Sequence, residues 1–175
     1  MAYYYSPFRN NYQRKLTDGC AFCDTEKIMH QAVRDKSGRI MENNYYIWLV
    51  NFFPKFEGHT LLVPKRHLIS LQDESLDEIL SRNKLMQYAV TVLERLYPDS
   101  GVEIFLQYGP GSAASISHIH WHIVPAMCND ELRSFEKLGH FYTTDQGKER
   151  VLLFPLKIDK AKEDLQTALS QVISN

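Results

Sequence analysis

Apolar and polar positions along the chain predict strands on both sides of one long helix. Dense aromatic and β-branched residues predict three strands, over 45–53, 59–67 and 102–109. Residues 70–97 instead repeat apolar positions at helical spacing, with Ser75 and Glu78 as a possible capping box and Pro98 as the stop. The apolar face of this helix is predicted to contain Leu76, Ile79, Leu80, Leu85, Val90, Leu93 and Leu96.

The rest of the chain adds two further strands and a second helix to this pattern. Strands are predicted over 117–125 and 150–158, and an amphipathic helix begins at Asp159. Residues 1–19 have little periodicity and are interpreted as an N-terminal arm, while 126–175 form a C-terminal extension without a recognisable motif. The order predicts an α+β fold with a mostly antiparallel sheet, in a single domain over 1–175.

Composition excludes several classes of function. The formal net charge of −1 gives no global basic excess, so we expect no nucleic acid polymer as a partner. The start of the chain has no apolar segment typical of a signal peptide, and no run reaches the roughly 18 apolar residues of a membrane span. We therefore expect no membrane partner and a cytoplasmic location.

Three histidines alternate with apolar residues in "SHIHWHIVP", residues 117–125. Because side chains alternate in a strand, His118, His120 and His122 are predicted to share one face, and Ile119 and Trp121 the other. The three imidazoles could bind one catalytic zinc. Alternatively they divide the work, with one imidazole as a nucleophile and the others holding phosphate or metal.

A Cys-x-x-Cys pair, Cys20 and Cys23, precedes the first strand. On its own the pair is compatible with zinc, with a redox pair, or with two buried apolar residues. Zinc would need two more ligands, and His67 at the end of "VPKRH" is a candidate. Cys128 has no partner in the sequence and is interpreted as a bystander.

The histidine pattern, with the small-residue loop "GPGSAAS" before it, resembles the signature of the histidine triad (HIT) superfamily. The stretch "VNFFPKFEGHTLLVPKRH" resembles the upstream pattern of that superfamily. The opening "YYSPFRNNYQRKLTDGCAFC" is similar to a branch with dinucleoside polyphosphate hydrolases and phosphorylases. The resemblance spans about residues 4–125 and implies a HIT-like fold and a homodimer.

The resemblance also implies a role for each histidine. His120 would attack the α-phosphorus of a nucleotide, the carbonyl of His118 would orient His120, and His122 would bind the α-phosphate. Nucleotide or phosphate contacts are implied or expected at Asn51, Gln107, Gly111, Ser112 and Ser115, with a base pocket near Phe53 and Leu62. Ala114 stands where many relatives carry a Gln that positions water or the leaving group in some branches. His59 follows Gly58 in the upstream pattern, where a site role and a structural role both stay open.

Several members of the superfamily carry a structural zinc, and the matching ligands here are Cys20, Cys23, His67 and His118. The function implied is a nucleotide hydrolase or nucleotidyltransferase that cleaves a dinucleoside polyphosphate, such as diadenosine tetraphosphate, through a nucleotidyl-His120 intermediate. The purine nucleotide substrate is the expected partner. A nucleoside phosphoramidase, a non-catalytic nucleotide-binding protein and a His₃ zinc hydrolase are the alternatives.

Overall fold

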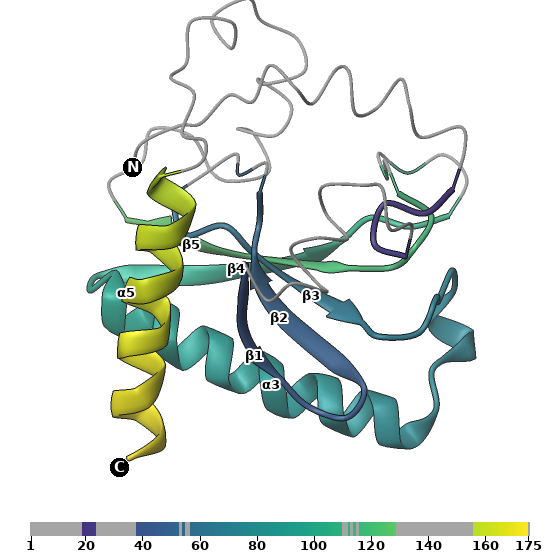
Figure 1. Ribbon diagram of the computed structural model, residues 1–175, viewed down its shortest axis with the longest axis horizontal. Coiled ribbons are helices and arrows are strands. Elements are labelled where there is room, and N and C mark those ends of the chain that lie inside the picture. The colour runs from purple at the N-terminus through teal and green to yellow at the C-terminus, as the bar shows by residue number, and fades with distance from the viewer. Residues whose placement is uncertain are drawn as a thin grey trace, which may run out of the picture.

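The computed structural model describes residues 19–23, 38–52, 54, 57–109, 112, 114, 116–128 and 156–174 (Figure 1). The strands are β1 Arg39–Glu42, β2 Tyr46–Val50, β3 Thr60–Pro64, β4 Ser100–Leu106 and β5 Trp121–Met127. A 3₁₀ turn, Leu71–Asp73, precedes helix α3, Leu76–Leu96, and helix α5 spans Leu156–Ile173.

The five strands form one sheet in the order β1-β2-β3-β5-β4, and every neighbouring pair is antiparallel. Helix α3 lies along the sheet, contacting β2, β3, β4 and β5, while α5 packs against α3, β1 and β2 (Figure 1). The predicted α+β fold, with an antiparallel sheet, a long helix and a C-terminal helix, is therefore confirmed. None of the helices in the described ranges has the length and apolar character needed to cross a membrane.

Helix α3 begins where the capping box predicts. Ser75 Oγ accepts from the Glu78 amide at 3.3 Å, and the Glu78 carboxylate accepts from the Ser75 amide at 2.7 Å. The predicted apolar face is wrong in the first two turns, where Leu76 and Leu80 are 69% and 59% exposed. Inward positions there are polar instead, because Glu78 pairs with Arg66. Further along, the buried residues are Leu85, Ala89, Val92 and Leu93.

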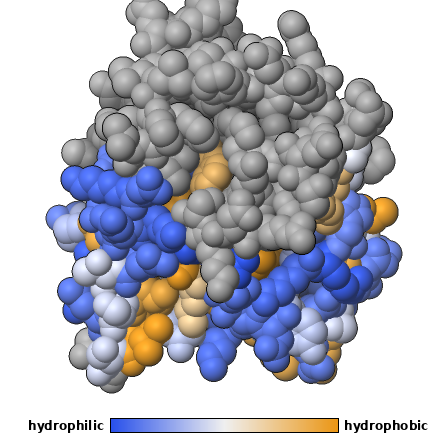
Figure 2. All heavy atoms as spheres, in the orientation of Figure 1, coloured by the Kyte–Doolittle hydropathy of each residue, from blue (hydrophilic) through white to orange (hydrophobic). Residues whose placement is uncertain are grey.

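The surface over these helices is mainly hydrophilic in the view of Figure 2, with apolar patches between the polar groups. This pattern is what amphipathic helices packed on one side of a sheet produce, because each keeps its polar face in water.

Two predicted strand boundaries are wrong for identifiable reasons. The histidine strand was expected over 117–125, but β5 begins only at Trp121. Upstream of it, the Ile119 amide donates to the carbonyl of Leu68 at 2.8 Å rather than to a neighbouring strand. Residues 156–158 belong to α5 and not to a strand over 150–158, whose first part lies outside the described residues. Pro155 stands immediately before that helix, and proline is common in the first turn of helices.

Candidate active site and metal centre

Strand β5 places His122 on the face of the sheet turned away from α3. Arg82 of α3 lies 4.6 Å from the centroid of the Trp121 ring, which marks the helix side of β5. Because side chains alternate along a strand, His122 points to the opposite face. Its cross-strand neighbours there are Leu61 of β3 and Phe105 of β4. Leu62 pairs with Trp121 on the helix side of the sheet and is fully buried, and the base pocket expected near Phe53 and Leu62 stays a prediction.

His120 is held by a hydrogen bond to the backbone within the histidine segment. Its Nδ1 lies 2.8 Å from the carbonyl oxygen of His118, and the side chain is almost completely buried. A carbonyl can only accept, so Nδ1 carries the proton in this contact. In the neutral ring the lone pair is then on Nε2, which is the state a nucleophilic imidazole requires. The geometry that the resemblance implied for the His118 carbonyl is present.

His122 is held by two further side chains. Its Nδ1 lies 2.8 Å from Nε2 of the buried His59, so one of these nitrogens donates and the other accepts. The Phe105 ring stacks on His122 with centroids 4.7 Å apart and planes at 11°. The side-chain nitrogen of Asn51, Nδ2, lies 3.2 Å from Nε2 of His59. The rings of His120 and His122 are 4.9 Å apart, so these groups form one cluster. His59 is therefore buried, hydrogen-bonded and part of the histidine cluster.

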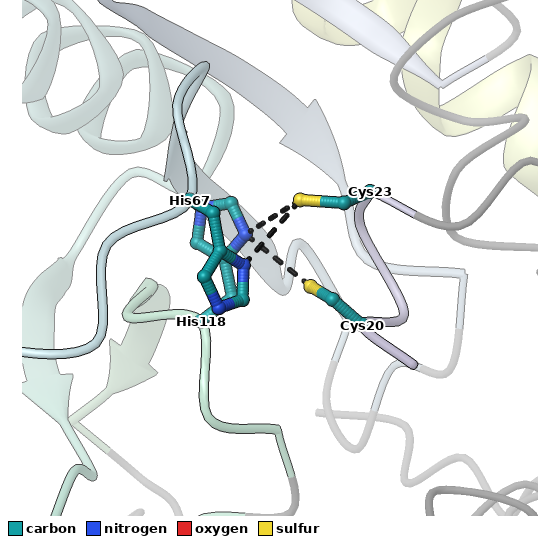
Figure 3. Close-up of side chains that lie close together, drawn as sticks. All are labelled: Cys20, Cys23, His67 and His118. Carbon is teal, nitrogen blue, oxygen red and sulfur yellow. Dashed lines mark hydrogen bonds between the residues drawn. The ribbon is translucent and has the colours of Figure 1, made fainter. Parts of the chain in front are cut away.

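The four predicted metal ligands come together beside this cluster (Figure 3). The Nδ1 of His118 lies 3.4 Å from both cysteine sulfurs, and the Nδ1 of His67 lies 3.5 Å from Cys23 Sγ. All four ligand atoms lie within 4.8 Å of one another. A tetrahedral zinc with bonds of about 2.3 Å to sulfur and 2.05 Å to nitrogen requires sulfur–nitrogen separations of about 3.6 Å. The spacing of the cluster therefore fits a closed Cys₂His₂ site.

The protonation states of His118 and Cys23 have clear physical causes. The Nε2 of His118 lies 3.1 Å from the carbonyl of Pro64, which places a proton on Nε2 and leaves the Nδ1 lone pair toward the thiols. Burial, with the nearby His67, lowers the pKa of His118 to about 4, so its ring is neutral at pH 7. Burial and the neighbouring Cys20 raise the pKa of Cys23 to about 11. A bound cation would reverse this preference by stabilising the thiolate.

Some of the other residues predicted to contact nucleotide are described in the structure, and the rest lie outside the described residues. Asn51 is buried, and Gln107 is half-buried just after β4. The Ser112 hydroxyl donates to the Gly109 carbonyl at 3.0 Å and accepts from the Ala114 amide at 3.2 Å. Residues 53, 111 and 115, which carry the predicted Phe, Gly and Ser contacts, lie outside the described residues.

Two aromatic residues beside the histidines were not predicted from the sequence. Phe105 stacks on His122, and Phe22 contacts both His118 and His120. Phe22 could have been found from its position between the two cysteines. Phe105 could have been found only from the strand register that pairs it with His122.

The fold and the histidine cluster agree with the comparison with known families. The HIT domain model matches residues 33–128, which is more than half of the 175-residue chain. The chain therefore belongs to the HIT domain family.

Related proteins extend this assignment. An uncharacterised 16.1 kDa HIT-like protein from Mycoplasma pneumoniae is 32% identical over 116 residues, covering 65% of this chain and 75% of that protein. A bifunctional bis(5'-adenosyl)-triphosphatase/adenylylsulfatase from Arabidopsis thaliana is 29% identical over 116 residues, covering 66% of this chain and 62% of that protein. The structure of a Zn-bound histidine triad family protein from Mycobacterium smegmatis has a TM-score of 0.57 at 23% identity, covering 78% of this chain and 86% of that one.

Proposed function

We propose that the protein is a nucleotide hydrolase or nucleotidyltransferase that attacks an α-phosphate through a covalent nucleotidyl-His120 intermediate. The observation that carries this proposal is the 2.8 Å contact between His120 Nδ1 and the His118 carbonyl. It directs the proton to one ring nitrogen and leaves the other with the lone pair that nucleophilic attack needs.

The reaction has two steps. Nε2 of His120 forms a bond to the α-phosphorus while the bond from phosphorus to the bridging oxygen of the leaving nucleotide breaks. Water or phosphate then attacks the same phosphorus, the phosphorus–nitrogen bond breaks, and the imidazole is restored with its lone pair on Nε2. Neutral imidazole suits this cycle near pH 7, because it is a nucleophile on entry and a leaving group on exit.

His122 is the proposed donor to the α-phosphate. The side-chain nitrogen of Asn51 can only donate, so His59 Nε2 accepts from it and also accepts from His122 Nδ1; His122 then donates to a phosphate oxygen through Nε2 when its ring carries both protons beside the anionic substrate. Donors aimed at nonbridging oxygens stabilise the charge of the transition state. Further proposed contacts come from Asn51, Gln107, Gly111, Ser112 and Ser115.

Dinucleoside polyphosphates are the proposed substrate class. The bis(5'-adenosyl)-triphosphatase from Arabidopsis thaliana supports this choice through its 29% identity over the matched region. A phosphoramidase would use the same nucleophile, with a phosphorus–nitrogen bond cleaved in the first step. A non-catalytic nucleotide-binding protein is the alternative from another class, and it predicts binding without turnover.

We propose zinc as the metal held by Cys20, Cys23, His67 and His118. Two thiolates and two imidazoles are a ligand set typical of structural zinc, and they leave no open position for substrate. The Zn-bound structure from Mycobacterium smegmatis supports the choice of metal. When bound, zinc would supply a fixed cross-link between the cysteine turn and the histidine segment. A His₃ zinc hydrolase fits the geometry less well, because His118 Nδ1 is directed at the thiols.

The test is a product assay with diadenosine tri- and tetraphosphate, with and without inorganic phosphate. With the tetraphosphate, AMP plus ATP indicates hydrolysis and ADP plus ATP indicates phosphorolysis. An adenosine phosphoramidate in parallel tests the phosphoramidase alternative. Binding of these compounds without turnover would support the non-catalytic alternative and contradict the proposal.

The matched variants are His120→Ala and His122→Ala. We expect loss of the nucleophile to lower kcat by at least about 10³-fold, and loss of one donor by roughly 10²- to 10³-fold. Mass spectrometry of His122→Ala quenched in denaturant at alkaline pH, where the phosphorus–nitrogen bond is stable, should detect the nucleotidyl adduct on the peptide with His120. Near-normal turnover by His120→Ala would show that the assigned mechanism is wrong.

We also propose a homodimer, as the family resemblance implies. Strand β4 ends the sheet among the described residues, and Ile104 on it is exposed. Light scattering during size exclusion tests the assembly. The cytoplasmic location stays a prediction.

A further inference from the structure

Phe22 connects the metal centre with the histidine cluster. It lies between the two cysteines in a turn closed by a 3.1 Å hydrogen bond from the Cys23 amide to the Cys20 carbonyl. The side chain is only 4% exposed, although Cys23 beside it is exposed. The turn therefore presents its cysteines to the proposed metal and its aromatic ring to the protein interior.

The ring of Phe22 packs edge-on against two histidines that have different proposed roles. Its centroid lies 5.4 Å from that of His118, with planes at 82°, and 5.2 Å from that of His120, with planes at 63°. Edge-on contact at these distances is a favoured geometry between aromatic rings. His120 is thus positioned both by the carbonyl of His118 and by the ring of Phe22.

The cysteine turn is joined to the histidines through contacts that a metal would strengthen. Without a metal, the sulfur–nitrogen separations of 3.4 and 3.5 Å from Cys20 and Cys23 are weak hydrogen bonds, since a thiol is a poor donor. With a metal bound, the same atoms are tied by coordination bonds, and the turn can no longer move relative to His118. Fixing the turn also fixes the ring of Phe22 against His120.

We infer that Phe22 is a positioning residue that makes the orientation of the His120 ring depend on metal bound at Cys20, Cys23, His67 and His118. This inference rests on the proposed function for the catalytic consequence, but the orientation of the ring can be measured without substrate. It explains why a closed metal site lies beside the histidine cluster. A metal bound at these four residues would act on His120 through Phe22.

The test is a cycle of two perturbations, Phe22→Leu and removal of Zn²⁺ by a chelator, measured singly and together. The first measurement is the rate at which diethyl pyrocarbonate modifies His120, followed by peptide mass spectrometry. Removal of Zn²⁺ from the wild-type chain should raise this rate about two- to tenfold, the range expected for loss of an edge-on aromatic contact. Zn²⁺-loaded Phe22→Leu should show the same rise, and removal of its metal should add little. The rate at His122 is the internal control and should not change.

The second measurement is turnover of diadenosine tetraphosphate, in which Phe22→Leu should lower kcat by a similar factor and leave KM within about twofold. Phe22→Tyr keeps the ring and should restore both measurements. Additive effects of the two perturbations on His120, or a Tyr variant that behaves like Leu, would overturn the inference. Absence of turnover in the wild-type chain would contradict the proposed function alone, because the modification cycle still reports on Phe22.

Discussion

Replacement of the buried Glu78 tests the energetics at the start of helix α3. Its carboxylate accepts from Arg66 Nε at 2.5 Å and Nη2 at 2.9 Å, and from the Ser75 amide at 2.7 Å. The Arg66 guanidinium, with the cap hydrogen bonds from Ser75, lowers the pKa of Glu78 from 4.5 to about 2 despite its burial. Glu78→Gln keeps an oxygen for the cap, because glutamine also completes a capping box, but removes the charge.

The expected cost follows from the shift in pKa. A difference of roughly 2.5 units at about 1.36 kcal/mol per unit gives about 3 kcal/mol, reduced to about 2 kcal/mol because the Arg66 side chain is half exposed and screened by water. A carboxyl with a lowered folded-state pKa stabilises the protein above its unfolded pKa. The contribution is then lost as the pH falls from about 4.5 towards 2.

The assay is urea unfolding of metal-free wild-type and Glu78→Gln chains from pH 6 to pH 2.5, so that metal release adds no pH dependence. The difference in free energy of unfolding should be about 2 kcal/mol at pH 6 and shrink strongly by pH 2.5. The control is Asp77→Asn, at an exposed first-turn position, which should cost less than about 1 kcal/mol. A Glu78→Gln difference that is equally large at both ends of the range would refute the electrostatic explanation.

Two more predictions concern the turn before β3 and the metal centre. Gly58→Ala should lower the free energy of unfolding by about 1–3 kcal/mol, because Gly58 has φ +71° and an added Cβ would lie 2.8 Å from both Pro125 Cγ and Tyr97 Cε2. Urea unfolding measures this, and Gly101→Ala is the control, since nothing lies within 4 Å of its added Cβ. An equal loss of unfolding free energy in Gly58→Ala and Gly101→Ala would contradict this prediction. For the metal centre, the proton of Cys23 by itself should make the affinity for Zn²⁺ rise about tenfold for each pH unit between pH 6 and 8, because the pKa of Cys23, about 11, lies above that range. Competition with a chromogenic chelator measures this affinity. An affinity independent of pH would show that this thiol is not a ligand.

Local signals in the sequence predicted both long helices and four of the five described strands, with β1 missed, but predicted poorly which residues each element buries. The capping box at Ser75 could be recognised, because its two partners are three residues apart in the sequence. The exposure of Leu76 and Leu80 could not be predicted from the sequence, because it depends on the ion pair that Arg66, just after β3, forms with Glu78.

In the candidate site, too, sequence patterns predicted which residues come together but not the detailed contacts between them. Cysteine and histidine spacing, with the family resemblance, brought Cys20 and His118 into one predicted ligand set, and their atoms lie 3.4 Å apart. The strand prediction placed three histidines on one face, whereas only His122 lies within β5. His118 uses its carbonyl for His120 Nδ1, which is a contact that a pattern of alternation does not reveal.

The ligands of the candidate metal centre are far apart along the chain: Cys20 and His118 are 98 positions apart, and Cys23 and His67 are 44 positions apart. In an unfolded chain these residues meet rarely, because closing a loop of this length is entropically costly. A bound ion therefore reports that three distant segments have already assembled. If Zn²⁺ binds the folded chain alone, each tenfold rise in free Zn²⁺ above the dissociation constant adds about 1.4 kcal/mol to the free energy of unfolding. The melting temperature of this protein would then depend on the zinc supply of its surroundings, and the amount of folded chain in a cell would follow zinc availability.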